Sequence, residues 1–315
     1  MKISVIISSM GRKFTLGRLL VNISNQTLLP NEIIIIEAGA ERWSPAEFPK
    51  SLADNICVTY APAMSLAAAR SKGQQLATGD LLIFIDDDII MPMSYIAESC
   101  NFLQSNPLIV AVGGCYTDDG VANRSRWSLG IGRLLGVYGD GSRNRIMRNG
   151  WLDYVRGKNR ERISSADWLF GCNSVIRAQA FDHPDIHFET DMAAWSFLED
   201  GYFYSKVIKA FGDCVRILPR LAVIHAPLDS SGNLSKITVR MRILYRYIFW
   251  RDQLSSGKIS DRLRFDLGML ANVLLMFKME RHPWIILECL KTCFFYSRNK
   301  QMNWIRANEY IFTQN

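Results

Sequence analysis

The sequence predicts an α/β fold, in which a mixed, mostly parallel sheet is flanked by helices and followed by a C-terminal helical extension. Over residues 1–115, short runs of β-branched residues alternate with segments of helical periodicity. The chain has 315 residues and is 49% hydrophobic, enough for one large domain with an appendage. From Ser235 onward the pattern is helical throughout. We therefore expect one domain over residues 1–234 and a helical region over residues 235–315.

Four apolar runs predict strands in the first 115 residues. They are Ser4 to Ser8, Ile33 to Ile36, Ile56 to Tyr60 and Leu81 to Ile85. The run from Ile33 to Ile36 has no polar residue, which is typical of a strand that is buried on both faces of a parallel sheet. Two helices should connect these strands. Thr15 is expected to cap the first, whereas Ser65 should cap the second and Gly79 should follow its end.

Residues 116–165 have a different composition, with many glycines and arginines and few aliphatic residues. A long glycine-rich connection of this kind is typical of an insert or a lid. Regular elements return after it. They are a strand from Ser174 to Arg177, a helix that begins at Glu199 and is closed by Gly212, and strands from Val215 to Leu218 and from Leu221 to Ile224.

The composition restricts the location of the protein. Its seven cysteines are scattered without metal-ligand spacing, which fits a reducing, cytoplasmic setting. The apolar run near Met1 is too short for an export signal, and we expect it to be a buried strand. No stretch reaches the roughly 20 apolar residues that a membrane-spanning helix needs.

The charge is concentrated near the C-terminus. The net charge is +7, and the segment from Ser235 onward contains about 14 Lys or Arg residues against about 6 Asp or Glu residues. Because this excess belongs to an amphipathic helical segment and no RNA-binding motif accompanies it, a nucleic-acid partner is not expected.

Polar residues follow several of the predicted strands. Met10 to Arg12, Glu37, and Asp86 to Asp88 all lie at carboxyl ends, where open α/β sheets bind their ligands, so they should converge on one edge. Three adjacent carboxylates after a buried strand are costly unless a cation compensates them, and Mg²⁺ or Mn²⁺ suits such oxygen ligands. If the chain stays extended, Asp86 and Asp88 share one face and Asp87 points the other way. The alternative is an acidic, solvated turn.

The segment Ile83 to Asp88, preceded by Ala69 to Gly73 and by Ala77 to Asp80, resembles the donor-site region of family 2 glycosyltransferases with the GT-A fold. The same resemblance extends to other segments in the family's order, over roughly residues 3–230. These segments are Val5 to Ser9, Gln26 to Ile36, Gly171 to Asn173, Glu199 with Asp200, and His225.

The resemblance implies a nucleotide-binding half over residues 1–115, the insert or lid over 116–165, and an acceptor half over 166–234. The residues it assigns to nucleotide-sugar binding are Ser8, Ser9, Arg12, Glu37, Arg70, Asp86 and Asp87. It implies that Asp86 contacts the ribose of the donor and that Asp88 binds a Mn²⁺ or Mg²⁺ ion, with Asp86 and His225 as further ligands. His225 could equally be a structural histidine.

Two departures from the family pattern leave the nucleotide open. Glu37 stands where an aspartate that reads the base is usual, and Ser71 stands where an asparagine is common. A UDP-sugar is the favoured donor and a dTDP-sugar is the alternative. An ordinary strand-end carboxylate is the other interpretation of Glu37, and Arg70 could be a solvated helix charge.

Glu199 and Asp200 resemble the acidic pair that supplies the catalytic base of the family. Transfer with inversion needs one carboxylate to accept the proton of the attacking hydroxyl, and Asp200 is the expected base. An aspartate in a first helical turn can also act as a cap or as a partner of the helix dipole. The residues implied on the acceptor side are Trp168, Gly171, Cys172 and Asn173, although Trp168 could simply fill the core and Gly171 to Asn173 could form a tight turn.

The C-terminal region contains a helical pattern of apolar, basic and aromatic residues. Ile237, Met241, Leu244 and Ile248 recur at helical spacing among arginines, with Tyr245, Tyr247 and Trp250 nearby. This pattern favours a helix that lies on an anionic membrane surface, on the inner face of the cytoplasmic membrane. The alternative is a helical subdomain that packs on the rest of the chain.

Together these observations predict an inverting, metal-dependent glycosyltransferase. It would move a sugar from a nucleotide-sugar donor to a hydroxyl of a glycan or lipid-linked glycan, in surface polysaccharide biosynthesis. Two alternatives are an aspartate-dependent phosphohydrolase and a glycosyltransferase-like scaffold subunit that has lost its activity.

Overall fold

A computed structural model of the chain describes residues 1–40, 42–117, 130, 132–226, 234–280, 282–299 and 301–313. The chain divides into two compact units. The first comprises Met1–Ala122 with Val155–Ser230, and the second comprises Asn123–Tyr154 with Ser231–Asn315. Much of the glycine-rich segment therefore groups with the C-terminal helices.

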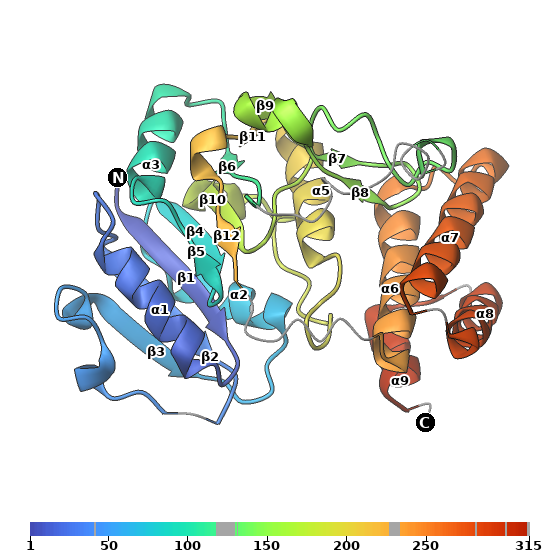
Figure 1. Cartoon of the computed structure of the whole chain (residues 1–315), viewed down its shortest axis with the longest axis horizontal. Coiled ribbons are helices and arrows are strands. Elements are labelled where there is room, and N and C mark those ends of the chain that lie inside the picture. The colour runs from blue at the N-terminus through green and yellow to red at the C-terminus, as the bar shows by residue number, and fades with distance from the viewer. Residues whose placement is uncertain are drawn as a thin grey trace. The chain divides into compact units, whose positions relative to one another are not determined.

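The first unit is built on a sheet that has eight strands among the described residues, in the order β3-β2-β1-β4-β10-β6-β11-β9 (Figure 1). Its strands are β1 (Ile3–Ser9), β2 (Glu32–Glu37), β3 (Ile56–Tyr60), β4 (Leu81–Asp86), β6 (Ala111–Gly113), β9 (Ser164–Ser165), β10 (Asn173–Arg177) and β11 (Val215–Ile217). The first four strands are parallel to one another. β10 is antiparallel to both β4 and β6. The predicted mixed, mostly parallel sheet with flanking helices is confirmed.

Helices cover both faces of this sheet. α1 (Lys13–Ser24) and α3 (Tyr95–Ser105) share a core with the side chains that Val5, Ile83 and Val175 direct to one face. α2 (Leu66–Leu76) packs on the opposite face, where Ala69 meets Ile34 and Ile36. α5 (Glu199–Phe211) reaches the same face through a stack of aromatic rings. In this stack Phe203 lies over Phe188, which in turn contacts Phe84.

Most of the predicted elements are confirmed, and two predicted helix boundaries are wrong. Ser65 caps α2 by accepting a hydrogen bond from the Ala68 N–H at 3.3 Å, as expected. Thr15 is not a cap, because α1 begins two residues earlier and the Thr15 hydroxyl donates to the Arg12 carbonyl inside the first turn. Gly79 does not end α2. Its missing side chain instead allows close approach to β1, because a Cβ there would lie 2.5 Å from Ser4 Oγ.

The later half of the first unit differs from the prediction in one strand. The helix that begins at Glu199 ends at Gly212, which has a left-handed φ of 73°, as expected. The strand predicted from Leu221 to Ile224 is wrong, because Pro219–Leu221 forms a short helical turn. Only β12 (Ile224–His225) remains, paired antiparallel with β5 (Ile89–Ile90).

The second unit consists of helices and one short hairpin among its described residues. The helices are α6 (Lys236–Phe249), α7 (Ile259–Glu280), α8 (Pro283–Arg298) and α9 (Trp304–Thr313), and the hairpin pairs β7 (Arg145–Ile146) with β8 (Leu152–Asp153). Within the described chain, no helix is both long enough and apolar enough to cross a bilayer.

α6 is the central helix of the second unit. Its apolar residues Met241, Leu244 and Ile248 are fully buried, and α8 and α9 pack against it. Two of its arginines, Arg240 and Arg246, are buried as well. Arg240 Nε lies 2.5 Å from Glu288 Oε1, and Arg246 donates to the Gly150 carbonyl at 2.6 Å. The apolar side chains that were expected to face a membrane are therefore packed within the second unit.

A test of the fold concerns Gly114, just after β6. A Cβ at this position would lie 1.8 Å from the carbonyl oxygen of Leu221, and a backbone atom cannot move aside cheaply. We expect Gly114→Ala to lower the free energy of unfolding by about 2 kcal/mol or more, measured by urea denaturation. In the control Gly17→Ala, the new methyl meets open space within α1 and should raise stability by about 0.5–1 kcal/mol. Equal stability of the two variants would contradict this packing.

Candidate active site

Three neighbouring strands bring their polar ends together at one edge of the sheet. β1 lies between β2 and β4, and its last residues are in register with theirs. Ser8 is the partner of Asp86, and Ser9 is the partner of Glu37. The predicted convergence of these residues is confirmed, because parallel strands in register place their carboxyl ends side by side.

Arg70 connects two carboxylates that are far apart in the sequence. From α2, its guanidinium lies 2.8 Å from Asp86 Oδ1 and 2.5 Å from Glu199 Oε2. The arginine is buried, so it is not a solvated helix charge. Gly171 makes this position available, because a Cβ there would lie 2.2 Å from Arg70 Nη1. Arg70 therefore joins the end of β4 to the beginning of α5.

The other two aspartates of the triplet share a different arginine. Arg12 Nη2 lies 2.7 Å from Asp87 Oδ1, and Arg12 Nη1 lies 3.0 Å from Asp88 Oδ2. The expectation that Asp86 and Asp88 share a face and Asp87 points away is therefore wrong. β4 ends at Asp86, and the next two residues form a turn, so the alternation of an extended strand does not continue.

His225 reaches Asp88 through the short pairing of β12 with β5. Its Nε2 lies 3.4 Å from Asp88 Oδ1. The ring of Tyr116 stacks on the imidazole, with centroids 5.3 Å apart and an interplanar angle of 27°. The hydroxyl of the same tyrosine lies 2.7 Å from Cys172 Sγ. Tyr116 was not singled out in the sequence analysis, and its position three residues after the end of β6, at the same kind of strand end, was the available signal.

Burial and charge shift the pKa values of these groups in opposite directions. Burial raises the pKa of Asp87 to about 7. The attraction of Arg12 opposes this rise only in part, because the Arg12 side chain is 43% exposed and screened by solvent. Burial also opposes ionisation of Asp88, but His225 and Arg12 outweigh it and lower the pKa of Asp88. Contact with Asp88 in turn raises the pKa of His225.

The acidic pair of α5 is also perturbed. Burial raises the pKa of Glu199 to about 7, against the attraction of Arg70 and with the repulsion of Asp200. Burial likewise raises the pKa of Asp200, although the Gly201 N–H donates a hydrogen bond to its Oδ1 at 2.8 Å. A carboxylate with a raised pKa is a stronger base, so this environment suits proton acceptance.

The chain enters α5 through a strained segment. Ala194, Ser196 and Leu198 have φ values of 49°, 48° and 68°, and none of them is glycine. Such left-handed conformations cost on the order of 1 kcal/mol or more each and persist only where the surroundings hold them in place. Leu198 directly precedes the acidic pair, so this strain lies next to the candidate base.

The same segment also holds the beginning of α2. The Leu66 N–H donates to the Ala194 carbonyl at 2.9 Å, and the Ala67 N–H donates to Ser196 Oγ at 3.2 Å. These bonds satisfy N–H groups of the first helical turn that have no partner within the helix. The position of Arg70, one turn further along α2, thereby depends on the residues that lead into α5.

Glu37 is fully buried and holds two loops. Its Oε1 accepts hydrogen bonds from the Gly11 N–H at 2.8 Å and from the Gly39 N–H at 2.7 Å. Within the described chain, Glu37 Oε2 and the hydroxyls of Ser8 and Ser9 are buried without a hydrogen-bond partner. Buried polar atoms are rarely left unsatisfied in native proteins, so this cluster fits a polar ligand at the strand ends.

The residues expected on the acceptor side are mostly interior. Trp168 is buried and packs edge-on against Phe170. Asn173 is fully buried, and its side chain bonds Tyr95 and the Leu221 carbonyl. Cys172 is buried beside Tyr116. Of the four predicted residues, Gly171 lines a small cavity together with Arg70, Glu199 and Asp200, among others.

Asp88 and His225 fit a divalent cation as a pair of protein ligands. Hard cations such as Mg²⁺ are often held by one or two carboxylates together with substrate phosphates. Asp88 Oδ1 is buried and lies 3.4 Å from His225 Nε2, so the two candidate ligands are neighbours. No set of three His, Cys, Asp or Glu side chains among the described residues could hold a metal. The predicted set that includes Asp86 is therefore not assembled, because Asp86 turns to Arg70 instead.

Comparison with known proteins assigns the chain to a family. The model of glycosyl transferase family 2 matches residues 4–183, and the chain belongs to this family. A glucosyl-dolichyl phosphate glucuronosyltransferase of Haloferax volcanii is 30% identical over 132 residues, which cover 39% of this chain and 41% of that protein. The matched part is thus less than half the length of that relative.

Two solved structures share the fold at low sequence identity. GalNAc-T7 with UDP, GalNAc and Mn²⁺ matches 85% of this chain and 54% of its own, with a TM-score of 0.55 and 17% identity. The mannosyltransferase PcManGT from Pyrobaculum calidifontis, in complex with GDP-Man and Mn²⁺, matches 99% of this chain and 79% of its own, with a TM-score of 0.55 and 14% identity. These likenesses confirm the GT-A fold.

The buried carboxylates predict a dependence of stability on pH. The pKa of Asp87 is about 7 in the folded chain and about 4 in the unfolded chain, so ionisation costs stability as pH rises from about 4 through about 7. We expect Asp87→Asn to remove roughly 3 kcal/mol of this loss, and its stability relative to the parent should be higher at pH 8 than at pH 4.5. Urea denaturation at both pH values measures the difference.

The control is Asp213→Asn, at an exposed ion pair with Arg216. Its stability relative to the parent should be similar at both pH values. If Asp87→Asn behaves in the same way as this control, Asp87 is not held in an environment that disfavours its charge.

Proposed function

We propose that the chain is an inverting, metal-dependent glycosyltransferase that moves a sugar from a nucleotide-sugar donor to a hydroxyl of a glycan or lipid-linked glycan. One observation carries this proposal. Arg70 bonds Asp86, at the end of the strand that would hold the donor, and Glu199, beside the candidate base Asp200. A single buried side chain therefore ties the donor side of the site to the catalytic side.

The donor side would be formed by the ends of β1, β2 and β4. Asp88 and His225 would hold Mn²⁺ or Mg²⁺, and the metal would supply positive charge to the diphosphate leaving group. Arg12 lies 3.0 Å from Asp88, and its side chain, which is 43% exposed, would turn toward the phosphates of a bound donor. The unsatisfied hydroxyls of Ser8 and Ser9 and Glu37 Oε2 would bond the nucleotide.

The nucleotide itself is proposed on weaker grounds than the class of donor. A UDP-sugar is favoured, with a dTDP-sugar as the alternative. The related structures were solved with UDP in one case and with GDP-Man in the other. The base pocket near Glu37 would decide between these nucleotides.

The reaction would be a single displacement. The acceptor oxygen forms a bond to the anomeric carbon while the bond from that carbon to the diphosphate oxygen breaks. Asp200 accepts the proton of the acceptor hydroxyl, and its raised pKa suits this role. Glu199 would keep the pair in place through its bond to Arg70.

The name of one relative supports the proposed class of acceptor. The dolichyl-phosphate-linked substrate in the name of the Haloferax volcanii protein supports a lipid-linked acceptor. We extend this to a role in surface polysaccharide biosynthesis, in the cytoplasm and on the inner face of the cytoplasmic membrane.

The two alternatives receive less support. A phosphohydrolase of the aspartate type needs a catalytic lysine, whereas the cations that contact Asp86, Asp87 and Asp88 are arginines and a histidine. An inactive scaffold subunit would bind nucleotide without turnover, and the same experiment separates it from an enzyme.

The experiment compares Asp200→Asn with the parent across UDP-, dTDP-, GDP- and CMP-sugars. We expect transfer to fall by about 10²–10⁴-fold, because the base that accepts the proton is lost. Thermal shift with the donor and Mn²⁺ should be unchanged, because Asp200 lies on the acceptor side. The control Asp54→Asn, at an exposed position of the same unit, should retain full transfer. Full transfer by Asp200→Asn would exclude the mechanism, and donor binding without turnover by the parent would favour the scaffold.

A further inference from the structure

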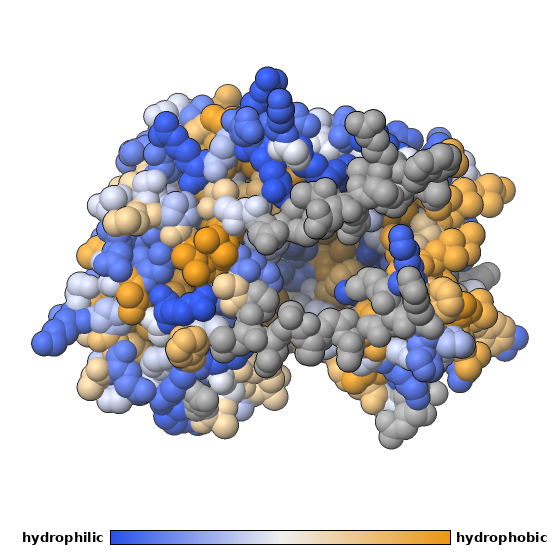
Figure 2. Space-filling model, in the orientation of Figure 1, coloured by the Kyte–Doolittle hydropathy of each residue, from blue (hydrophilic) through white to orange (hydrophobic). Residues whose placement is uncertain are grey.

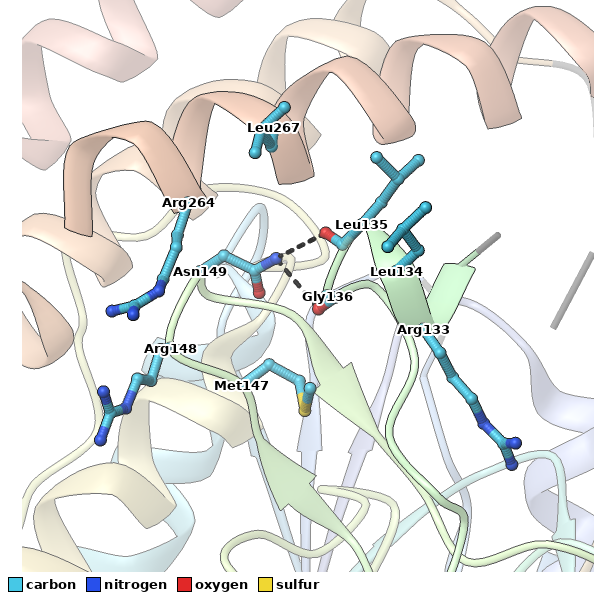
Figure 3. A pocket seen from close by; sticks show the side chains of 9 residues that line it. All are labelled: Arg133, Leu134, Leu135, Gly136, Met147, Arg148, Asn149, Arg264 and Leu267. Atoms are coloured by element: carbon cyan, nitrogen blue, oxygen red, sulfur yellow. Dashed lines mark hydrogen bonds between the residues drawn. The ribbon is translucent and has the colours of Figure 1, made fainter. Parts of the chain in front are cut away.

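The second unit contains a cavity of about 300 Å³ between α7 and the segment of residues 133–149 (Figure 3). It is lined by Arg133, Leu134, Leu135, Gly136, Met147, Arg148, Asn149, Arg264 and Leu267. These nine residues include three arginines and no carboxylate. The cavity therefore has a positive rim and leucine walls.

The walls of this cavity are fixed by hydrogen bonds and close packing. Asn149 Nδ2 donates to the Gly136 carbonyl at 3.0 Å, which holds the loop opposite α7 (Figure 3). Gly268 lets α7 approach this loop, because a Cβ there would lie 2.6 Å from Asn149 Nδ2. The cavity is thus built into the unit by specific contacts.

The positive charges of the arginines at the rim of the cavity are only partly offset by their neighbours. Arg133 donates to the carbonyls of Gly139 and Asp140, which leaves its positive charge uncompensated by these bonds. Arg264 lies 3.3 Å from Asp261, and Arg148 is exposed. The single carboxylate of Asp261 offsets only part of the three positive charges, so the rim suits an anion.

α7 has two apolar faces, and among the described residues only one of them is covered. Phe265, Met269 and Met276 are buried within the unit. A second row of leucines follows the helix on the other side and is about half exposed. The exposed side chains are Leu263 at 58%, Leu267 at 50%, Leu270 at 53% and Leu274 at 55%, and Leu134 beside the cavity is 86% exposed.

This row and the cavity form one surface, because Leu267 belongs to both. Figure 2 shows hydrophobic residues gathered over the C-terminal helices. A contiguous patch of exposed apolar residues often marks an interaction site, whereas single exposed apolar residues are common on any surface. We call the surface of Leu134, Leu263, Leu267, Leu270, Arg133, Arg148 and Arg264 the α7 surface.

The chemistry of the α7 surface selects among partners. Leucines next to arginines match an anionic bilayer, in which phosphate groups lie directly above acyl chains. A second copy of the chain fits less well, because a two-fold interface would bring the arginine rims of both copies together. The partner favoured by charge is therefore an anionic lipid bilayer.

We propose that the α7 surface docks on an anionic membrane, with its leucines in the headgroup boundary and its arginine-rimmed cavity on a lipid phosphate. This deepens the proposed function, and it rests on that function only for the idea that a lipid-linked acceptor is presented at the same bilayer. It also replaces α6, which is buried, as the membrane-facing helix.

Flotation of the full chain with vesicles tests the proposal. The parent should bind phosphatidylcholine vesicles that contain about 30% phosphatidylglycerol, more weakly as salt rises, and should bind pure phosphatidylcholine poorly. R148Q/R264Q should lower the partition coefficient by about fivefold per arginine. L263Q/L267Q should lower it by at least about tenfold.

Matched controls carry the same changes on the first unit. K50Q/R220Q removes two exposed positive charges there, and L108Q replaces an exposed leucine. Neither should change binding by more than about twofold, because these side chains do not belong to the α7 surface. All variants should unfold at the parent temperature, because the altered side chains lie on the surface.

Several results would overturn the proposal. These are equal vesicle binding by the parent and both α7-surface variants, or equal losses in the first-unit controls. Another is a dimer in light scattering that L263Q/L267Q dissolves, which would assign the leucines to a second copy. A thermal shift by inorganic phosphate without any vesicle binding would assign the cavity to a free anion. Transfer to a water-soluble acceptor should persist in the α7-surface variants, so failure here is distinguishable from failure of the glycosyltransferase mechanism.

Discussion

The site depends on the buried guanidinium of Arg70, which bonds Asp86 and Glu199 at the same time. A buried arginine is stable only when its charge and its hydrogen bonds are satisfied, and breaking such a pair leaves an uncompensated charge in the interior. Much of the local structure serves this contact. Gly171 gives the guanidinium room, and the strained segment before α5 holds the first turn of α2. The interaction therefore fixes the acidic pair relative to the strand ends.

The same edge of the sheet carries more negative than positive charge. Two arginines and a histidine face the aspartate triplet and the acidic pair of α5, and burial raises the pKa of both Asp87 and Glu199 to about 7. A cation and a ligand rich in hydrogen-bonding groups would relieve both the repulsion and the unsatisfied hydroxyls. The chain belongs to glycosyl transferase family 2. In the proposed function, a nucleotide diphosphate with a metal ion would supply both the positive charge and the hydrogen-bonding groups.

The sequence predicted those features that depend on local pattern and chain order. Apolar runs located β1 to β4, and the rule for strand ends brought Met10 to Arg12, Glu37 and Asp86 to Asp88 together. Prediction from the sequence failed where the structure depends on a neighbour that is distant in the sequence. The direction of the Asp87 side chain depends on where β4 ends. The burial of α6 depends on packing by α8 and α9, and an amphipathic pattern with arginines does not tell whether a helix packs on other helices or on a membrane. Tyr116 was missed because its partners, Cys172 and His225, are distant from it in the sequence.

We propose that Asp88 and His225 hold a metal ion and that Arg12, which lies 3.0 Å from Asp88, moves to the phosphates of the donor when the ion binds. A crystal structure with Mn²⁺ and the nucleoside diphosphate that gives the largest thermal shift tests it most directly. We expect anomalous manganese density between Asp88 and His225, with Arg12 withdrawn from Asp88 toward phosphate. Manganese bound elsewhere, with the ion pair between Arg12 and Asp88 intact, would contradict the claim.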